Sequence, residues 1–252
     1  MEETTLRISA SPHVRDRKTT SSLMLDVIIA LLPASVLVYI IWNKSILADL
    51  NLYSILYFFE WGVEMLLHRN STVKDFSAVV TGLLLALNLS PEVPVWMAIL
   101  GSAFAIIIVK QLFGGLGQNF MNPALGARCF LLISFAGKMT TFTYDGVTTA
   151  TPLAILKSGG TVDVLDMFIG KIAGTIGETS AICLLIGGLY LIIRKVISPI
   201  IPLVYIGTFS VFIFLYSLAS GMGFEPLYLA AHLCGGGLML GAFFMATDYV
   251  TS

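Results

Sequence analysis

The sequence predicts an all-α, polytopic membrane protein built as a bundle of transmembrane helices. Two observations carry this prediction. First, 57% of the residues are hydrophobic and only 12% are charged, whereas soluble domains average about 45–50% apolar and about 25% charged residues. Second, apolar runs close to the roughly 20 residues that cross the hydrocarbon core recur along the chain. The net charge of −1 gives no indication of nucleic-acid binding.

The apolar runs predict eight membrane spans. The first run follows a polar segment, residues 1–22, and is not followed by a small-residue cleavage site, so it predicts a signal anchor rather than a cleaved signal peptide. We therefore expect a cytoplasmic N-terminal segment at 1–22 and a transmembrane domain at 23–252. The spans are expected at about 23–42, 50–67, 76–90, 95–112, 122–137, 167–193, 199–219 and 227–246.

Two of these spans are irregular. Span 76–90 is short for a full crossing and ends in a polar Asn-Leu-Ser-Pro sequence. Span 167–193 is too long for one crossing and contains several glycines together with Glu178. We expect it to form a glycine-rich broken half-helix followed by a full helix over about 180–193.

The charges of the loops predict the orientation of the chain. The loops at 91–94 and 220–226 contain no Lys or Arg, and the positive-inside rule places such loops on the outer face. The same rule puts the N-terminus in the cytoplasm and the loop 138–166 on the outer face. The basic residues counted for the cytoplasmic face, besides those before the first span, are His68, Arg69, Lys74, Lys110, Arg194 and Lys195.

Two glycine clusters interrupt the apolar pattern, one at 114–117 and one at 235–241. Interrupted segments in corresponding halves indicate inverted repeats around a site at the midplane, and simple close helix packing through glycines explains them equally well. The chain ends at 248–252, just past a span and without a polar tail. We therefore expect further C-terminal helices to be missing.

The most unusual segment is polar and lies at 145–152, with the sequence Asp-Gly-Val-Thr-Thr-Ala-Thr-Pro. Thr151, followed by Pro152 and an apolar run, predicts the start of a helix with Thr151 as its N-cap. Capping alone would explain such a pair. A helix N-terminus also favours anions, so a phosphate esterified to Thr151 would lie in a favourable field. Asp145 could orient a hydroxyl or Mg²⁺ during attachment, or merely form a turn with Gly146.

The segment Asp145-Gly146-x-Thr148-x-Ala150-Thr151 resembles the flavinylation motif of the RnfD/NqrB family of membrane flavoproteins. Thr149 stands where that motif usually has Gly. The resemblance extends over nearly the whole chain and implies about ten spans in two inverted five-helix halves. The short segment before the first span is more similar to the RnfD members than to the NqrB members. Three further motifs carry the resemblance: Gly114-Gly115-x-Gly117-x-Asn119-x-x-Asn122-Pro123-Ala124, Gly174-x-x-Gly177-Glu178-Thr179-Ser180 and Met245-Ala246-Thr247-Asp248.

The resemblance implies a covalently bound cofactor. In that family a dedicated flavin transferase moves the FMN part of FAD onto the last Thr of the motif. This implies an FMN phosphoester on Thr151, with Thr148, Thr149, Ala150 and Pro152 as its surroundings. The resemblance also implies a second, non-covalent riboflavin in some members.

Two asparagines and two acids complete the candidate site residues. Asn119 and Asn122 offer amide groups that could hold the edge of a flavin ring, or they could cap a helix break before a proline. Glu178 and Asp248 lie at membrane depth beside glycine breaks, where acids are energetically unfavourable and usually functional. They could bind Na⁺, relay protons, or cap glycine-rich helix ends.

The sequence therefore predicts a membrane electron-transfer subunit of an Rnf-type complex, which couples ferredoxin:NAD⁺ electron transfer to Na⁺ or H⁺ translocation. The expected partners are the other membrane, flavin and Fe–S subunits and the flavin transferase, all at the cell (inner) membrane. No catalytic residue and no metal site is expected, because the three cysteines and three histidines form no cluster. The alternatives are an NqrB-like subunit of a Na⁺-pumping NADH:quinone reductase, and a channel or secondary transporter without flavin.

Overall fold

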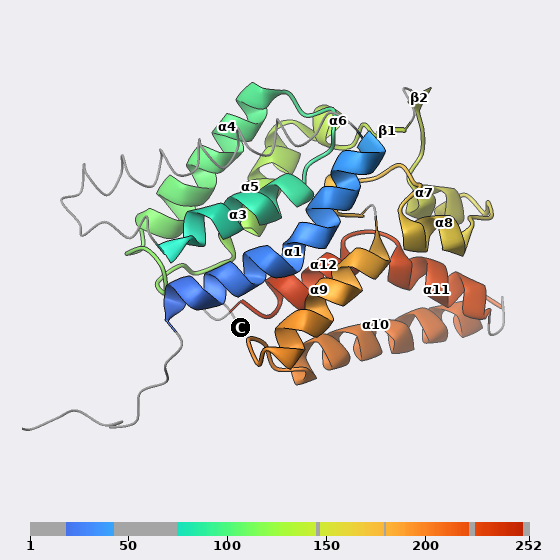
Figure 1. Ribbon diagram of the computed structural model, residues 1–252. Helices are drawn as coiled ribbons and strands as arrows, with labels where there is room; N and C mark the ends of the chain where they lie inside the picture. The colour runs from blue at the N-terminus through green and yellow to red at the C-terminus, as the bar shows by residue number, and fades with distance from the viewer. Residues whose placement is uncertain (1–18, 43–74, 145–146, 179, 222–224, 249–252) are drawn as a thin grey trace, which may run out of the picture.

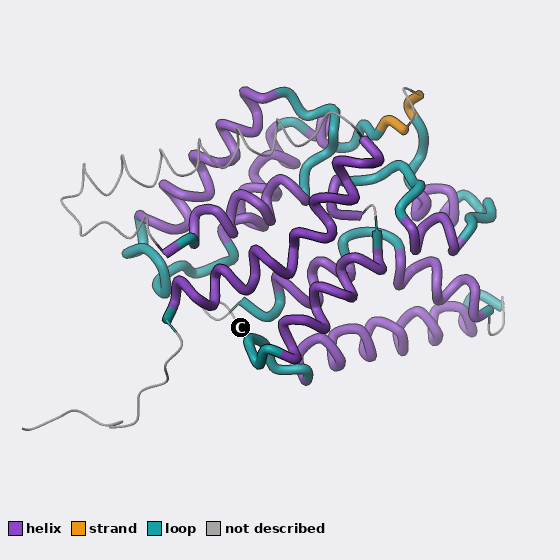
Figure 2. Tube along the Cα trace, viewed as in Figure 1, coloured by secondary structure: helices purple, strands orange, loops and turns teal. Residues whose placement is uncertain are grey.

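The computed structural model of the chain describes residues 19–42, 75–144, 147–178, 180–221 and 225–248. These residues form a helical bundle with one small β-hairpin (Figures 1 and 2). The elements of the first part are α1 (Thr20–Trp42), α3 (Ser77–Leu87), α4 (Val95–Ala103), the π-helix η2 (Phe104–Gln111), α5 (Pro123–Ser134) and α6 (Ala136–Met139). The expected span 50–67 lies outside the described residues.

The second part begins with a polar loop and ends with a broken helix. Its elements are β1 (Thr143–Tyr144), β2 (Val147–Thr148), α7 (Pro152–Lys157), α8 (Val164–Ile169), the 3₁₀ turn η3 (Ile176–Glu178), α9 (Ala181–Ile193), α10 (Ile200–Ala219), α11 (Pro226–Cys234), α12 (Leu238–Leu240) and the π-helix η4 (Gly241–Met245). The broken span predicted at 167–193 is confirmed, because irregular backbone separates α8 from the full helix α9.

Several helices have the length and composition of membrane spans. Within the described residues, two single helices are long and apolar enough to cross a membrane, Thr20–Leu37 and Ile200–Ala219. The pair formed by α11 and residues 238–245 makes a third if it counts as one span. That pair is bent by 64° at the glycine cluster, which confirms an interrupted helix there. The other apolar helices are shorter, at 10–17 residues. The chain is a multi-pass, all-α membrane protein.

The core lies where α1, α3, α9 and η4 meet. Leu31, Leu85, Leu191 and Leu240, one from each of α1, α3, α9 and α12, are almost fully inaccessible to solvent. A Cβ atom built on Gly187 of α9 would overlap the backbone carbonyl of α1, so these two helices approach as closely as glycine permits. In contrast, α10 is mostly exposed, as is typical of a helix that faces lipid or a partner subunit.

An ion pair marks one end of the bundle, and the polar loop marks the other. Asp26, near the start of α1, pairs with Arg194 at the end of α9, with 3.2 Å between carboxylate and guanidinium. The polar loop lies at the other end of α1, together with β1, β2, α7 and α8 (Figure 1). The residues after α9 and the polar loop therefore lie at opposite ends of α1, which is the relative arrangement that the loop charges predict.

Candidate functional site

The polar loop presents Thr151 on an ordered scaffold. Strands β1 and β2 pair antiparallel, with Thr143 opposite Thr148, and the Thr149 N–H donates to the Phe142 carbonyl at 3.1 Å. The hairpin is fastened to the α3–α4 connection, because the Thr143 hydroxyl donates to Glu92 Oε1 at 2.6 Å. Asp145 and Gly146, which come between the two strands in the sequence, lie outside the described residues.

Thr151 is the N-cap of α7, as the sequence predicts. Its backbone is extended, Pro152 follows at the first helical position, and the Thr151 Oγ1 accepts the Ala154 N–H at 3.4 Å. The side chain is partly exposed, whereas Pro152 is buried. This capping bond uses a lone pair of the oxygen and not the hydroxyl proton, so a phosphoester at Oγ1 leaves the capping atom in place.

A cleft of about 240 Å³ adjoins the segment before α7. Thr149, Ala150 and Pro152 line it, together with one basic residue, Lys171, and two acids, Asp163 and Asp166. Thr148 is exposed on the hairpin. The arrangement offers a partly exposed hydroxyl oxygen beside a hollow that carries charges of both signs.

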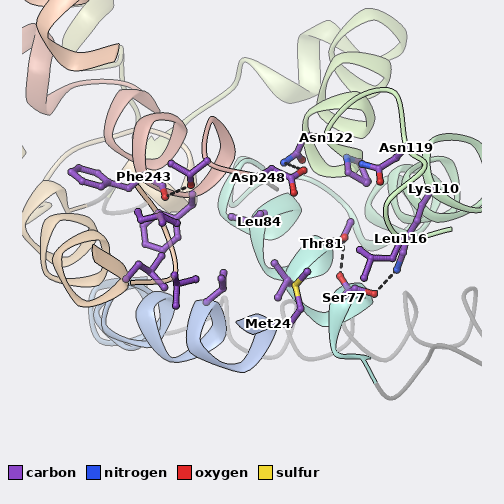
Figure 3. A pocket seen from close by; sticks show the side chains of 18 residues that line it. Met24, Ser77, Thr81, Leu84, Lys110, Leu116, Asn119, Asn122, Phe243 and Asp248 are labelled. Carbon is purple, nitrogen blue, oxygen red and sulfur yellow. Dashed lines mark hydrogen bonds between the residues drawn. The ribbon is translucent and has the colours of Figure 1, made fainter. Parts of the chain in front are cut away.

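A second group of polar residues lies inside the bundle, around a cavity of about 80 Å³ (Figure 3). Asn122 and Asp248 meet there, with the Asn122 Nδ2 donating to Asp248 Oδ2 at 3.5 Å. The Asn122 Oδ1 caps α5 by accepting the Ala124 N–H at 3.0 Å. The same side chain therefore caps the helix break and contacts the acid, so the structure confirms the capping interpretation of Asn122.

Asn119 lines the same cavity, and its Nδ2 donates to the Met121 carbonyl at 3.0 Å. Lys110 also lines the cavity. This corrects the expectation that Lys110 is one of the basic loop residues of the cytoplasmic face. Its side chain is only 2% exposed, and its Nζ donates to Ser77 Oγ at 2.7 Å. The π-helical backbone of η2 turns both Lys110 and Gln111 to the buried side, and such segments frequently lie at functional sites.

Glu178 lies apart from this cavity, in η3. Its Oε2 accepts the Thr175 N–H at 3.4 Å. The glycines of its motif make room for this turn: a Cβ on Gly174 would stand 2.8 Å from the Glu178 carboxylate, and one on Gly177 would stand 2.7 Å from the Leu87 carbonyl oxygen. The motif therefore serves to press η3 against the end of α3.

Sequence reasoning missed Arg128, the charged residue within α5. The Arg128 Nη1 donates to Asn88 Oδ1 at 2.7 Å, across 40 residues of sequence, and the guanidinium interacts electrostatically with Glu178. An arginine inside an apolar run was the signal that could have identified it.

These features define a class of protein: a helical membrane protein whose broken helices bring polar groups into the bundle, with an ordered polar loop at one end. The chain belongs to the NQR2, RnfD, RnfE family, whose model matches residues 7–252. Its relatives carry names that describe their complexes.

A relative from Acetobacterium woodii is 49% identical over 100% of this chain and 80% of its own length, and is named as a subunit of a Na⁺-translocating ferredoxin:NAD⁺ oxidoreductase complex. One from Clostridium ljungdahlii is 42% identical over 97% of this chain and 78% of its own, and is named as a subunit of the proton-translocating counterpart. One from Rhodobacter capsulatus is 34% identical over 96% of this chain and 78% of its own, and is named as a subunit of an ion-translocating oxidoreductase complex.

Proposed function

We propose that this chain is the membrane electron-transfer subunit of an Rnf-type ion-translocating ferredoxin:NAD⁺ oxidoreductase, and that it carries FMN as a phosphoester on Thr151. The names of the relatives support the complex, and they favour ferredoxin:NAD⁺ over NADH:quinone chemistry. The observation that supports the cofactor is the geometry of Thr151, an N-cap with an accessible oxygen in the motif position. The subunit acts within the complex and is not catalytic alone.

The residues around Thr151 fit the attachment of a flavin phosphate. A bound FMN would supply reversible one- and two-electron transfer, which no side chain provides. Pro152 holds the backbone rigid after the attachment point, and the exposed Thr148, Thr149 and Ala150 leave the approach open for a flavin transferase.

The loop and its cofactor are proposed to face the outside of the cell membrane, with the N-terminus in the cytoplasm. We also propose that the helices of the chain are arranged as inverted repeats. The close pairing of α1 with α9 and the meeting of two short helices in the centre support this symmetry, since Asn88 at the end of α3 contacts the sulfur of Met245 in η4 at 3.9 Å. NAD⁺ and ferredoxin would bind to other subunits of the complex.

The inner cavity is proposed as the place of ion coupling and of a second flavin. Asp248 and Asn122 present oxygen and nitrogen atoms to one small space, while Glu178 has Arg128 as an electrostatic partner. At about 80 Å³ the enclosed space is much smaller than ligand pockets, which begin near about 300 Å³. A riboflavin would not fit inside it, whereas the open hollow of about 730 Å³ that Asn122 also lines has room for one.

In-gel flavin fluorescence tests the proposal. The denatured chain, co-expressed with a flavin transferase, should fluoresce, and Thr151→Ala should abolish the signal. Thr148→Ala is the matched control, because it removes a hydroxyl in the same exposed loop without touching the attachment point; it should retain the signal, at most weakened. Loss of the signal in both variants, or in neither, would contradict attachment at Thr151.

A further inference from the structure

Arg128 stands in an unusual place for a cation. It lies inside α5 among apolar residues, and its side chain is half-buried between helices. Charged side chains in membrane spans are energetically unfavourable, and they are retained where they pair with specific groups or act on ions. The role of Arg128 can therefore be inferred from the groups that surround it.

The guanidinium faces the carbonyl end of a half-helix. Asn88 is the C-cap of α3, and its side chain is buried. Its Oδ1 accepts a hydrogen bond from Arg128 Nη1 at 2.7 Å, and its Nδ2 donates one to the Leu84 carbonyl at 2.6 Å. Asn88 thus connects the arginine with the last turn of α3. A helix C-terminus carries roughly half a negative charge, so the arginine neutralises this end.

A second negative group and a helix break complete the surroundings. Glu178, the acid of the glycine motif in η3, lies within electrostatic range of Arg128. The Ile176 N–H donates to the Leu89 carbonyl at 3.0 Å, which holds this turn against the end of α3. On the other side, a Cβ built on Gly237, in the break between α11 and α12, would stand 3.7 Å from Arg128 Nη1. One guanidinium therefore lies among a half-helix end, an acid and a broken helix.

In transporters with broken helices, half-helix C-termini and unwound carbonyls coordinate a free Na⁺ or proton. We propose that Arg128 occupies this position as a tethered cation. It neutralises the C-terminal end of α3 and the Glu178 carboxylate, and it thereby closes the space between α3, η3 and the break at Gly237 to Na⁺. The proposal rests on the chain being the membrane subunit proposed above. It deepens that function by distinguishing an ion-excluding group, Arg128, from the cavity at Asp248 that is proposed above for ion coupling.

The proposal predicts that removal of the tethered charge lets free cations enter. The full chain, without flavin, is reconstituted into liposomes, and Na⁺ efflux is measured for wild type, Arg128→Met and Arg128→Lys. Arg128→Met keeps much of the length but loses the charge, and we expect efflux about tenfold faster or more, which corresponds to about 1.4 kcal/mol of barrier. Arg128→Lys keeps the charge and should remain as tight as wild type.

A second measurement separates charge from packing. Arg128→Ala should be stabilised against heat by guanidinium ions at concentrations far below those that denature, in a saturable manner, because the free ion refills the site. Cys129→Ala, the neighbouring exposed position, should show no such effect. If Arg128→Met fails to fold, recovery of folded Arg128→Ala by guanidinium during purification supports the proposal, and its absence overturns it.

Equal efflux from wild type and Arg128→Met, or a thermal stability of Arg128→Ala that does not respond to guanidinium, would also overturn it. None of these measurements uses the cofactor, so they stand or fall separately from the flavin on Thr151.

Discussion

Gly177 should be among the least replaceable positions of the chain, because it allows η3 to contact α3. A Cβ at this position would stand 2.7 Å from the Leu87 carbonyl oxygen, 2.9 Å from the Leu87 Cβ and 3.0 Å from a methyl group of Leu240. The first two atoms belong to the backbone of α3 or are bonded directly to it, so no rotamer change relieves the overlap. Overpacking of this kind costs about 1–3 kcal/mol, and we expect Gly177→Ala to lie near the upper value.

Two other glycines give a graded comparison. Gly174→Ala would bring a Cβ to 2.8 Å from the Glu178 carboxylate, which can swing aside, so the loss should be about 1 kcal/mol or less. Gly207, inside α10, has nothing within 4 Å of the added carbon, and Gly207→Ala should be neutral or stabilise by up to about 1 kcal/mol through helix propensity.

Thermal unfolding in detergent measures the series. For a chain of this size 1 kcal/mol corresponds to about 2–4 °C, so a loss of about 3 kcal/mol means that Gly177→Ala should unfold about 6–12 °C lower than wild type, clearly below Gly174→Ala. If Gly177→Ala were as stable as Gly207→Ala, the close contact between η3 and α3 would be refuted as the reason for this motif.

Three further predictions concern the charged residues and the loop. Arg194→Met should destabilise more than Asp26→Asn in thermal unfolding, by about 1 kcal/mol or more. It leaves a buried carboxylate without its cation and with the Tyr190 hydroxyl as a hydrogen-bond donor, whereas Arg194 is 56% exposed and can be hydrated; the reverse order would contradict the pairing. Asp248→Asn should spare flavin content and assembly but lower ion uptake into vesicles, whereas Glu178→Gln should leave ion uptake near the wild-type rate because Arg128 already neutralises Glu178; normal pumping by Asp248→Asn would make that acid structural. A cysteine at position 149 should react with a membrane-impermeant thiol reagent in intact cells without flavin, and one at position 198 should not; the opposite labelling would overturn the orientation.

The sequence predicted most of the helices because burial in lipid leaves long apolar runs. The spans expected at 95–112 and 199–219 agree with Val95–Gln111 and Ile200–Ala219. The break at the glycine cluster was also predicted, because successive glycines without side chains favour bends. The π-helical registers of η2 and η4 were not predicted, since they add a residue to a turn without changing the apolar pattern.

The candidate site could be predicted only where it is local in sequence. Thr151 as an N-cap follows from its neighbour Pro152, and the structure confirms it. The hydrogen bond between Arg128 and Asn88 joins residues that are 40 positions apart in the sequence. No local sequence pattern predicts a contact over such a separation. Lys110 was assigned to a loop because a lysine at the end of a span is usually hydrated. Its burial depends on Ser77, which tertiary packing alone brings within reach.

The covalent flavin on Thr151 is the central claim, and the intact mass of the purified chain tests it most directly. The chain is co-expressed with a flavin transferase, weighed whole, and then cleaved so that the added mass can be assigned to a peptide. We predict a gain of one FMN minus one water, carried by the peptide that contains Thr151 and absent from Thr151→Ala. An unmodified wild-type chain, or the same gain on a peptide outside residues 147–157, would contradict the account.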